Sequence, residues 1–215
     1  MTKGSILDII DDRISVFRKW CDKSGLHQKE HQISGMKFCL EHEFKKSVFG
    51  VHGGIVADEM GLGKTILMLG CILTNYRVVD FYKQKCRNTL IVVPKALLFQ
   101  WVDVINRLFN GKVKINIFHG VNCKYVTRDE LETGAITITT YGMVSRDAIQ
   151  NTFWKRVIFD EAHHLRNSKS KKHTGSILIK AKIKWLLSGT PINNRVKDLE
   201  SLCKILLGAK RSCVY

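Results

Sequence analysis

Residues 58–65 of this 215-residue chain read DEMGLGKT, and they decide how the rest of the sequence is interpreted. They follow a short apolar run at residues 53–57, GGIVA, and precede an apolar segment at residues 65–76. A glycine-bent loop between a buried strand and a helix is a setting in which proteins hold phosphate groups. The general pattern G-x-x-x-x-G-K-[ST] has glycine at its first position, where this chain has Asp58. The stretch therefore predicts a phosphate-binding loop with one departure from the general pattern.

Four residues of this loop have chemical roles in that interpretation. Gly61 and Gly63 allow the backbone to curl so that its N–H groups face a phosphate, and the following helix N-terminus adds a partial positive charge. Lys64 supplies a positive charge for the β- and γ-phosphates, and Thr65 supplies a hydroxyl for Mg²⁺. The loop thus predicts a site for a nucleoside triphosphate and magnesium.

Short apolar runs alternate with helical segments beyond residue 50. The runs are often β-branched, as expected of strands buried on both faces of a sheet, and lie at residues 54–57, 90–93, 115–118, 136–140, 157–159 and 185–187. Helical segments are expected at residues 65–76, 96–109, 170–180 and 196–207. This alternation predicts an α/β fold with a doubly wound, mostly parallel sheet. Ligands of such sheets bind at the carboxyl ends of the strands, so the residues that follow the runs form the candidate site.

An acidic pair follows the apolar run at residues 157–159. Asp160 at the carboxyl end of a strand can hold Mg²⁺ facing the phosphate loop. Glu161 is placed to orient or polarise the water that attacks a γ-phosphate, and His163 to couple the site to a neighbouring segment. An acidic pair by itself is typical of a helix cap or a solvated turn, but together with the upstream G-K-T it indicates a nucleotide site. The interpretation requires Lys64 and Asp160 to lie close together at one edge of the sheet.

The composition favours a polyanionic partner. Thirty-five Lys and Arg residues against nineteen Asp and Glu residues leave a net charge of +16, which favours nucleic acid through phosphate neutralisation. The seven cysteines are scattered without a C-x-x-C pair, so reduced thiols are expected in place of a zinc site or a disulfide framework. No apolar run approaches the roughly 18 residues of a transmembrane helix, and acidic residues near the N-terminus are unlike a secretory signal. A soluble, intracellular protein is expected, located in the nucleus if the source is a eukaryotic cell.

An amphipathic helix is expected at residues 5–20, because apolar residues recur there at helical spacing: Ile6, Ile10, Ile14 and Phe17. Packing against the main domain is its expected role. We therefore divide the chain into an N-terminal helix at residues 1–25 and one domain at residues 26–215, with a second helical pattern around Met36.

These motifs resemble the Swi/Snf-type branch of the superfamily 2 helicase-like ATPases, over nearly the whole chain beyond the N-terminal helix. The resemblance implies a RecA-like P-loop NTPase lobe that binds ATP and Mg²⁺, with Thr65 and Asp160 at the metal. Gln32 resembles the family's nucleotide-contacting glutamine, whose amide is expected to reach the adenine ring. The phosphate loop looks like the family's own version, Asp58 included, so its implied nucleotide contacts are Asp58, Glu59, Met60, Gly61, Leu62, Gly63, Lys64 and Thr65.

Further segments resemble the family's motifs in the same order along the chain. Residues 90–101 (LIVVPKALLFQW) look like motif Ia, and FHG at residues 118–120 and TTYG at residues 139–142 look like two shorter motifs. In the family these line the nucleic-acid groove, which implies DNA contacts by Lys95, His119, Thr140 and Tyr141. Residues 160–163 resemble motif II and residues 188–191 (SGTP) resemble motif III, which implies that four residues couple the nucleotide to DNA: His163, Ser188, Gly189 and Thr190. Asn193 stands where many members have glutamine.

The resemblance implies an ATP-driven translocase on double-stranded DNA. No segment resembles motifs IV to VI, so a second RecA-like lobe with its catalytic arginine is absent from this sequence, and very slow hydrolysis by the chain alone is expected. Two alternatives stay open: a strand-separating DNA or RNA helicase, and a non-catalytic nucleotide-binding scaffold. The intact Lys64, Asp160 and Glu161 argue against the scaffold.

A basic stretch near the C-terminus has two interpretations. It consists of Lys169, Lys171, Lys172, His173, Lys180, Lys182 and Lys184. These residues either contact duplex phosphates or form a solvated helix face followed by the entry to a strand.

Overall fold

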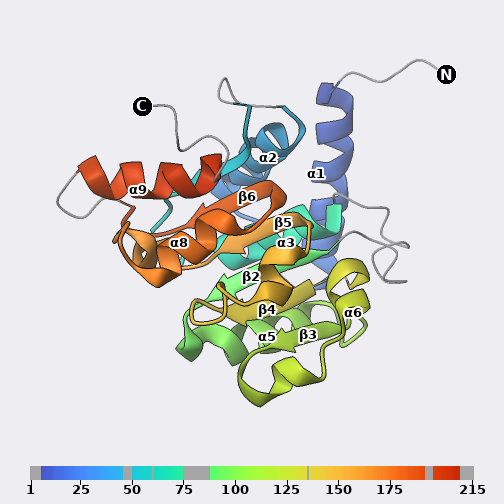
Figure 1. Cartoon of the computed structure of the whole chain (residues 1–215). Helices are drawn as coiled ribbons and strands as arrows, with labels where there is room; N and C mark the ends of the chain where they lie inside the picture. Colours follow the sequence, from blue (N-terminus) through green and yellow to red (C-terminus); the bar gives the residue numbers. More distant parts are fainter. Residues whose placement is uncertain are drawn as a thin grey trace.

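The computed structural model describes residues 6–45, 50–59, 61–74, 88–134, 136–191 and 196–208. At its centre is a six-stranded sheet in the order β1-β6-β5-β2-β4-β3, and each pair of neighbouring strands is parallel (Figure 1). Each strand overlaps one of the six predicted runs, so the predicted α/β fold with a doubly wound sheet is confirmed. The strands are β1 (His52–Val56), β2 (Thr89–Val93), β3 (Ile115–Phe118), β4 (Ile136–Thr140), β5 (Trp154–Phe159) and β6 (Ala181–Leu187).

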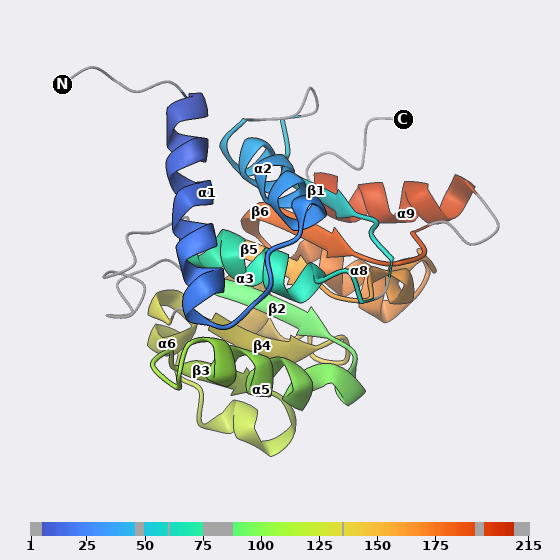
Figure 2. The same ribbon diagram turned by 180° about the vertical axis from the view of Figure 1, so that it is seen from behind.

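Helices cover both faces of the sheet. Successive residues of a strand point to opposite faces, so apolar strands contribute side chains to a hydrophobic core on each face. On β2, Ile91 and Val93 belong to one hydrophobic core, and Leu90 and Val92 belong to the other. Figure 2 shows the first face, which is covered by α1 (Ile6–Lys23), α2 (Glu30–Phe44), α3 (Lys64–Thr74) and α5 (Leu98–Leu108). The second face is covered by α6 (Arg128–Thr133), α7 (Asp147–Asn151), α8 (Lys171–Leu178) and α9 (Val196–Leu207).

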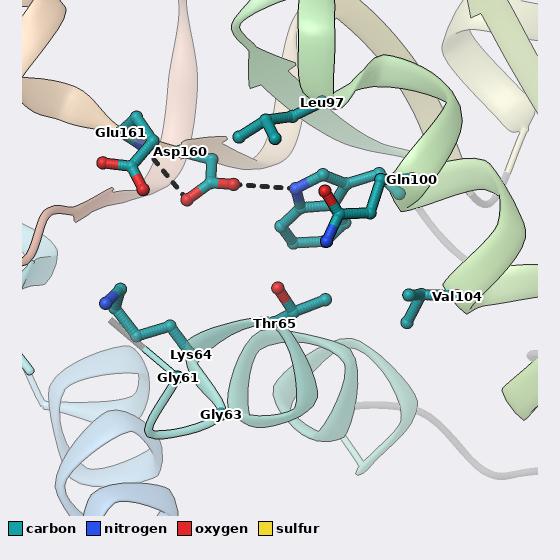
Figure 3. A pocket seen from close by; sticks show the side chains of 10 residues that line it. Gly61, Gly63, Lys64, Thr65, Leu97, Gln100, Val104, Asp160 and Glu161 are labelled. Atoms are coloured by element: carbon teal, nitrogen blue, oxygen red, sulfur yellow. Dashed lines mark hydrogen bonds between the residues drawn. The ribbon is translucent and has the colours of Figure 1, made fainter. Parts of the chain in front are cut away.

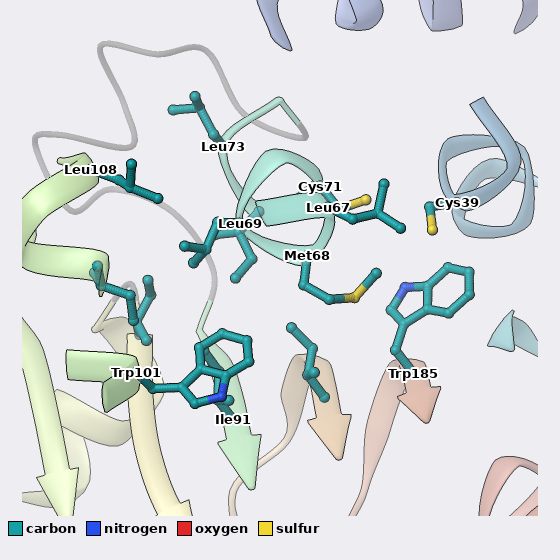
Figure 4. Packing of buried hydrophobic residues seen from close by; sticks show 14 of the residues in the cluster. Cys39, Leu67, Met68, Leu69, Cys71, Leu73, Ile91, Trp101, Leu108 and Trp185 are labelled. Carbon is teal, nitrogen blue, oxygen red and sulfur yellow. The ribbon is translucent and has the colours of Figure 1, made fainter. Parts of the chain in front are cut away.

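The helix that follows the phosphate loop, α3, is buried along almost its whole length. Its residues from Leu67 to Thr74 are all buried. Met68 points from α3 towards the strands, where Ile91 of β2 and Trp185 of β6 lie in the same core (Figure 4). Because α3 is held against the sheet in this way, the loop at its start is held at the carboxyl edge of the sheet.

The N-terminal helix α1 packs into the same core, as predicted. Phe17 is fully buried, whereas Ile6 is 44% exposed, so the predicted apolar stripe is buried only beyond the first turn. A Cβ atom on Gly70 of α3 would lie 2.5 Å from two ring carbons of Phe17. Glycine at position 70 therefore allows α1 to approach α3 closely. A turn at Ser24 and Gly25 separates α1 from α2, and the division of the chain at residue 25 stays a prediction.

The basic stretch does not form one exposed face. His173 of α8 is 2% exposed, and its Nε2 lies 3.0 Å from the carbonyl oxygen of Ser201. Lys184 of β6 is 5% exposed, and its ammonium donates to the carbonyl oxygen of Ile205 over 2.9 Å. Burial lowers the pKa of Lys184 to about 8. Neither side chain is available to duplex phosphates, whereas exposed positions are occupied by Lys169, Lys171, Lys172, Lys180 and Lys182.

Short helices also form outside the predicted segments. The sequence did not predict them because a helix of one or two turns is too short to show a hydrophobic periodicity. These are α6, α7, η2 (Gly120–Lys124) and η3 (Ala162–Leu165). The helix predicted at residues 96–109 begins with a separate 3₁₀ turn, η1 (Lys95–Leu97). The last two residues of the segment predicted at residues 65–76 lie outside the described residues. Among the described helices, none combines the length and the apolar character that a bilayer-crossing helix requires.

Candidate nucleotide-binding site

The phosphate loop curls around the ammonium group of its own lysine. Lys64 Nζ donates to the carbonyl oxygens of Asp58 and Glu59, over 2.7 and 2.9 Å. Gly61 and Gly63 have φ values of 84° and 90°, a region that residues with a side chain rarely adopt. The two glycines therefore make the turn that places Lys64 and the helix N-terminus inside it. Met60 lies outside the described residues.

Gln32 lies directly against this loop. A Cβ atom on Gly63 would approach Gln32 Nε2 to 2.6 Å, so the amide sits where any larger residue would be. The neighbouring His31 has its Nε2 3.3 Å from the carbonyl oxygen of Leu62. On the other side, the backbone N–H of Lys29 donates to Gln32 Oε1 over 3.4 Å. The start of α2 is thus packed on the phosphate loop, and Gln32 is half-buried beside it.

The phosphate loop and the acidic pair face each other across one cavity of about 350 Å³. In Figure 3, Lys64 and Thr65 lie on one side of the cavity, and Asp160 and Glu161 lie on the other. The convergence that the sequence required of Lys64 and Asp160 is therefore present. The residues that line the cavity are Gly61, Gly63, Lys64, Thr65, Leu97, Gln100, Trp101, Val104, Asp160 and Glu161.

Asp160 follows β5 and is only 7% exposed. Its Oδ2 accepts a hydrogen bond from the indole N–H of Trp101 over 2.8 Å, and its Oδ1 accepts one from the backbone N–H of Glu161 over 3.0 Å (Figure 3). Burial raises the pKa of the Asp160 carboxyl above its usual value, while the hydrogen bonds from Trp101 and Glu161 and the charge of Lys64 oppose the rise. Each carboxylate oxygen keeps a second lone pair, so the group can still accept a metal ion or a metal-bound water.

Glu161 is one of two described non-glycine residues with a positive φ; the other is Asn110. Its φ and ψ are both 50°, the left-handed conformation. Its Oε2 lies 3.1 Å from His163 Nδ1, so a protonated His163 would form an ion pair with it. The ring of His163 in turn contacts that of His164, with centroids 4.5 Å apart and the planes tilted by 35°. The acidic pair is therefore connected to the first residues of η3.

The segment that resembles motif III lies between the two halves of the site, because β6 lies between β1 and β5 in the sheet. The backbone N–H of Ser188 donates to the carbonyl oxygen of Val56, the last residue of β1, over 3.1 Å. The Ser188 hydroxyl accepts from the backbone N–H of Thr190 over 3.2 Å. Arg166, just after η3, donates to the Thr190 hydroxyl over 3.0 Å. Gly189 is half-buried between them. This strand end thus contacts both the strand before the phosphate loop and the segment after the acidic pair.

The comparison of the sequence with family models decides the family. The model described as "SNF2-related domain" matches residues 31–211, which includes Gln32, the phosphate loop, the acidic pair and the segment at residues 188–191. The chain belongs to the SNF2-related family.

Curated relatives of this SNF2-related chain include proteins of transcription termination and DNA repair. The chain is 32% identical over 191 residues to "Transcription termination factor 2" of Drosophila melanogaster and 32% identical over 211 residues to "DNA repair protein RAD5" of Kluyveromyces lactis. It is 34% identical over 179 residues to "DNA repair protein rad8" of Schizosaccharomyces pombe. The alignments cover 72%, 79% and 72% of this chain but only 18%, 19% and 16% of those relatives.

The fold matches solved SNF2-family structures. The "Sulfolobus solfataricus SWI2/SNF2 ATPase core in complex with dsDNA" aligns with a TM-score of 0.67 at 26% identity, covering 84% of this chain and 36% of that one. The "Sulfolobus solfataricus SWI2/SNF2 ATPase core domain" aligns with a TM-score of 0.64 at 26% identity, covering 82% and 34%. The SNF2-related chain therefore has the RecA-like ATPase fold that its sequence predicted, and it spans about a third of those solved chains.

The four residues expected to contact DNA lie at or just after the carboxyl ends of β2, β3 and β4, which lie side by side in the order β2-β4-β3. Lys95 is exposed and His119 is half-exposed. Thr140 and Tyr141 are each only 4% exposed. His119 Nδ1 lies 3.0 Å from the Thr140 hydroxyl, and the Tyr141 hydroxyl donates to the carbonyl oxygen of Asp160 over 2.6 Å. The structure therefore does not support Tyr141 as a DNA contact through its side chain; the buried phenol contacts the acidic pair instead.

One wall of the cavity was not expected from the sequence. It comes from η1 and α5, and its side chains are Leu97, Gln100, Trp101 and Val104. Their spacing of three and four residues indicates one face of a helix, but residues that pack in a core show the same spacing, so the sequence does not mark them as cavity residues. Trp101 lay inside the motif Ia segment, yet its hydrogen bond to Asp160 joins residues 59 positions apart. Only the packing of α5 against the sheet brings these two together.

Proposed function

We propose that this chain is the ATP-binding lobe of an ATPase that couples ATP hydrolysis to movement on double-stranded DNA. The observation that carries the proposal is the placement of Lys64 and Thr65 opposite Asp160 and Glu161 across one cavity. A cationic loop and an acidic pair at neighbouring strand ends are the parts that phosphoryl transfer from a nucleotide requires.

The phosphate loop holds the Lys64 ammonium in a position that suits a phosphate. Its ammonium has three N–H donors, and the carbonyl oxygens of Asp58 and Glu59 accept from two of them. The third donor and the charge are available to a β- or γ-phosphate oxygen. Because the lysine is only 9% exposed, its charge acts in a partly dehydrated site, where it stabilises an anion more strongly than in water.

The oxygen donors of the site suit Mg²⁺. The Thr65 hydroxyl and the Asp160 carboxylate both line the cavity, and hard oxygen ligands of this kind, completed by waters and phosphates, are those that Mg²⁺ takes. Bound there, Mg²⁺ would neutralise charge on the phosphates. Thr65 and Asp160 are the residues we propose to hold it, Thr65 directly and Asp160 through water.

Glu161 is the residue we propose to orient and polarise the attacking water. Its carboxylate lines the same cavity, and His163 lies 3.1 Å away from it. Catalysis by such sites is mainly positioning and charge stabilisation, and an arginine from a second lobe is worth about 10³–10⁵ in turnover. We therefore propose that a second RecA-like lobe completes the site and that this chain alone hydrolyses ATP very slowly.

Double-stranded DNA is the proposed track. Its support is the net charge of +16, the family, and a solved relative described in complex with dsDNA. The proposed contact surface lies where β2, β4 and β3 end, with Lys95 and His119 as its accessible side chains. For a eukaryotic source, the names of the relatives point to the nucleus.

Calorimetry of nucleotide binding to this chain tests the proposal. We expect Mg²⁺–ATP to bind, and Lys64→Ala to weaken binding about 10- to 100-fold, because a charge-assisted hydrogen bond contributes about 1.5–3 kcal/mol. Lys112→Ala is the matched control, since this exposed lysine precedes β3 at the opposite edge of the sheet. Absence of ATP binding, or equal affinity in the Lys64 and Lys112 variants, would overturn the proposed function.

A further inference from the structure

Two aromatic side chains donate hydrogen bonds to Asp160, one to its backbone carbonyl and one to its carboxylate. The carbonyl oxygen of Asp160 accepts the hydroxyl of Tyr141 over 2.6 Å. The indole N–H of Trp101 donates to the Asp160 carboxylate over 2.8 Å, and the other carboxylate oxygen accepts the backbone N–H of Glu161 over 3.0 Å. The carbonyl, the N–H and the side chain of this turn therefore all have a defined partner.

The two aromatic residues reach the turn from opposite faces of the sheet. Trp101 belongs to α5 and to the core on the first face, and Tyr141 follows β4 and belongs to the core on the second face. Their exposed fractions are 3% and 4%, and that of Asp160 is 7%. Water has little access to replace either hydrogen bond, so each bond controls an atom that has few other partners.

The conformation of Glu161 explains why such a hold is needed. A non-glycine residue in the left-handed region is strained and persists only where its surroundings determine it. Asn110, the other described non-glycine residue with a positive φ, lies in the turn after α5, and asparagine tolerates this conformation. Glutamate adopts this conformation less readily than asparagine, so contacts of its neighbours must offset the strain at position 161.

We infer that Trp101 and Tyr141 are positioning residues of the ATPase site. Tyr141 keeps the Asp160–Glu161 peptide in the orientation that gives Glu161 its left-handed conformation, and Trp101 keeps the Asp160 carboxylate directed into the cavity. The inference rests on the proposed function in one respect: the proposed function assigns Asp160 to the metal and Glu161 to the attacking water.

Packing alone does not account for these residues. A phenylalanine at position 141 would fill the same space in the core as the tyrosine, but it would leave the buried carbonyl of Asp160 without its donor. A phenylalanine at position 101 would keep an aromatic ring but would leave one Asp160 carboxylate oxygen without the indole N–H as its donor. The two hydrogen-bonding groups, not the rings, are therefore the parts of the inference that can be tested.

The test uses backbone and side-chain NMR of the 215-residue chain in four variants. Tyr141→Phe and Trp101→Phe remove the two donors. Tyr125→Phe is the control for the hydroxyl, because Tyr125 is 80% exposed. Trp20→Phe is the control for the indole, because Trp20 is 6% exposed and its N–H has no hydrogen-bond partner among the described residues.

We expect the chemical shifts and the amide coupling of Glu161 to show a positive φ in the wild-type chain and in both controls. Tyr141→Phe is expected to lose this signature, and Trp101→Phe is expected to average the Asp160 side chain over several rotamers. Retention of the positive φ in Tyr141→Phe together with an unchanged Asp160 rotamer in Trp101→Phe would show that both residues only pack.

A second measurement tests whether Trp101 contributes to Mg²⁺ binding through Asp160. Removal of a group that orients a metal ligand typically weakens metal binding about 10-fold or more. Trp101→Phe is therefore expected to reduce the gain in ATP affinity that Mg²⁺ provides, measured as the ratio of affinities with and without the metal, by about this factor. An unreduced gain would overturn the role of Trp101. Failure of the wild-type chain to bind ATP would reject the proposed function, while the NMR result would still decide the positioning roles.

Discussion

Glu43 and Arg156 form a buried bidentate ion pair between α2 and β5, although 113 residues separate them in the chain. Arg156 Nε and Nη2 donate to the two carboxylate oxygens over 2.6 and 2.5 Å, and the exposed fractions of the two residues are 4% and 0%. The indole N–H of Trp185 in β6 donates to Glu43 Oε1 over 3.0 Å. The helix that carries Gln32 is therefore bound to the strand that leads to Asp160 and to the strand beside it.

Removal of one charge of this pair should be more destabilising than removal of both. Arg156→Met leaves the Glu43 carboxylate buried without its arginine, and we expect it to lower the free energy of unfolding by about 3–5 kcal/mol. In the double variant with Glu43→Gln no buried charge is left, and the glutamine carbonyl can still accept from Trp185. Urea denaturation of the single and double variants measures the difference. A double variant as unstable as Arg156→Met would contradict this account.

Gly63→Ala should affect both stability and nucleotide binding. The alanine would have to keep a φ of +90°, which strains the backbone. Its Cβ would lie 2.6 Å from Gln32 Nε2, so it should displace the amide from the loop. Backbone strain of this kind costs about 1–3 kcal/mol, and the loss of Gln32 should weaken ATP binding as well. Gly111→Ala is the matched control: its φ is +64°, and nothing lies within 4 Å of its Cβ. Equal ATP affinity in the two variants would show that ATP binding does not depend on the position of Gln32 against the loop.

Lys184 should make the stability of the fold depend on pH. Its pKa falls from 10.5 to about 8 on folding, because burial disfavours the ammonium form. The unfolded chain therefore binds more protons than the folded chain between about pH 8 and pH 10.5, so the free energy of unfolding should rise with pH in this window. The expected change is about 3 kcal/mol, from 1.36 kcal/mol per pKa unit.

Lys184→Met should remove that rise. Measured against the wild-type chain, the variant should gain most below about pH 8, and its relative stability should decline as the pH rises towards 10.5. Lys182→Met, at an exposed position of the same strand, should follow the wild-type profile. Chemical denaturation at a series of pH values makes the comparison. Parallel profiles for the wild-type chain and Lys184→Met would refute the lowered pKa.

Lys95→Ala should weaken the binding of duplex DNA in a way that depends on salt. If the ammonium neutralises one phosphate, the slope of log affinity against log salt concentration should become about one unit shallower. Fluorescence anisotropy with a labelled duplex measures the slope, with Lys112→Ala as the control at the opposite edge. The same measurement on Lys171→Ala and Lys172→Ala decides between the two interpretations of the exposed basic residues of α8. An unchanged slope in Lys95→Ala would exclude it from the DNA surface.

The sequence by itself determined the strands, the phosphate loop and the acidic pair. These features are local: a strand buried on both faces must be a short apolar run, and a phosphate loop needs its glycines, lysine and threonine consecutively. Because ligands of parallel sheets bind at the carboxyl ends of the strands, the convergence of Lys64 and Asp160 followed from the same reasoning. The SNF2-related family followed from the order of the motifs.

Tertiary structure decided which polar side chains are buried and what they contact. Tyr141 was expected to contact DNA, but its hydroxyl donates to the carbonyl oxygen of Asp160. Lys184 was grouped with the basic stretch, but its ammonium donates to the carbonyl oxygen of Ile205 in the last turn of α9. The bond between Trp101 and Asp160 and the pair of Glu43 with Arg156 had no sequence signal. The physical reason is that the partners lie 19 to 113 residues apart. Whether a tyrosine, a lysine or an arginine faces water or another side chain depends on which helix covers its strand, and no local pattern records that choice.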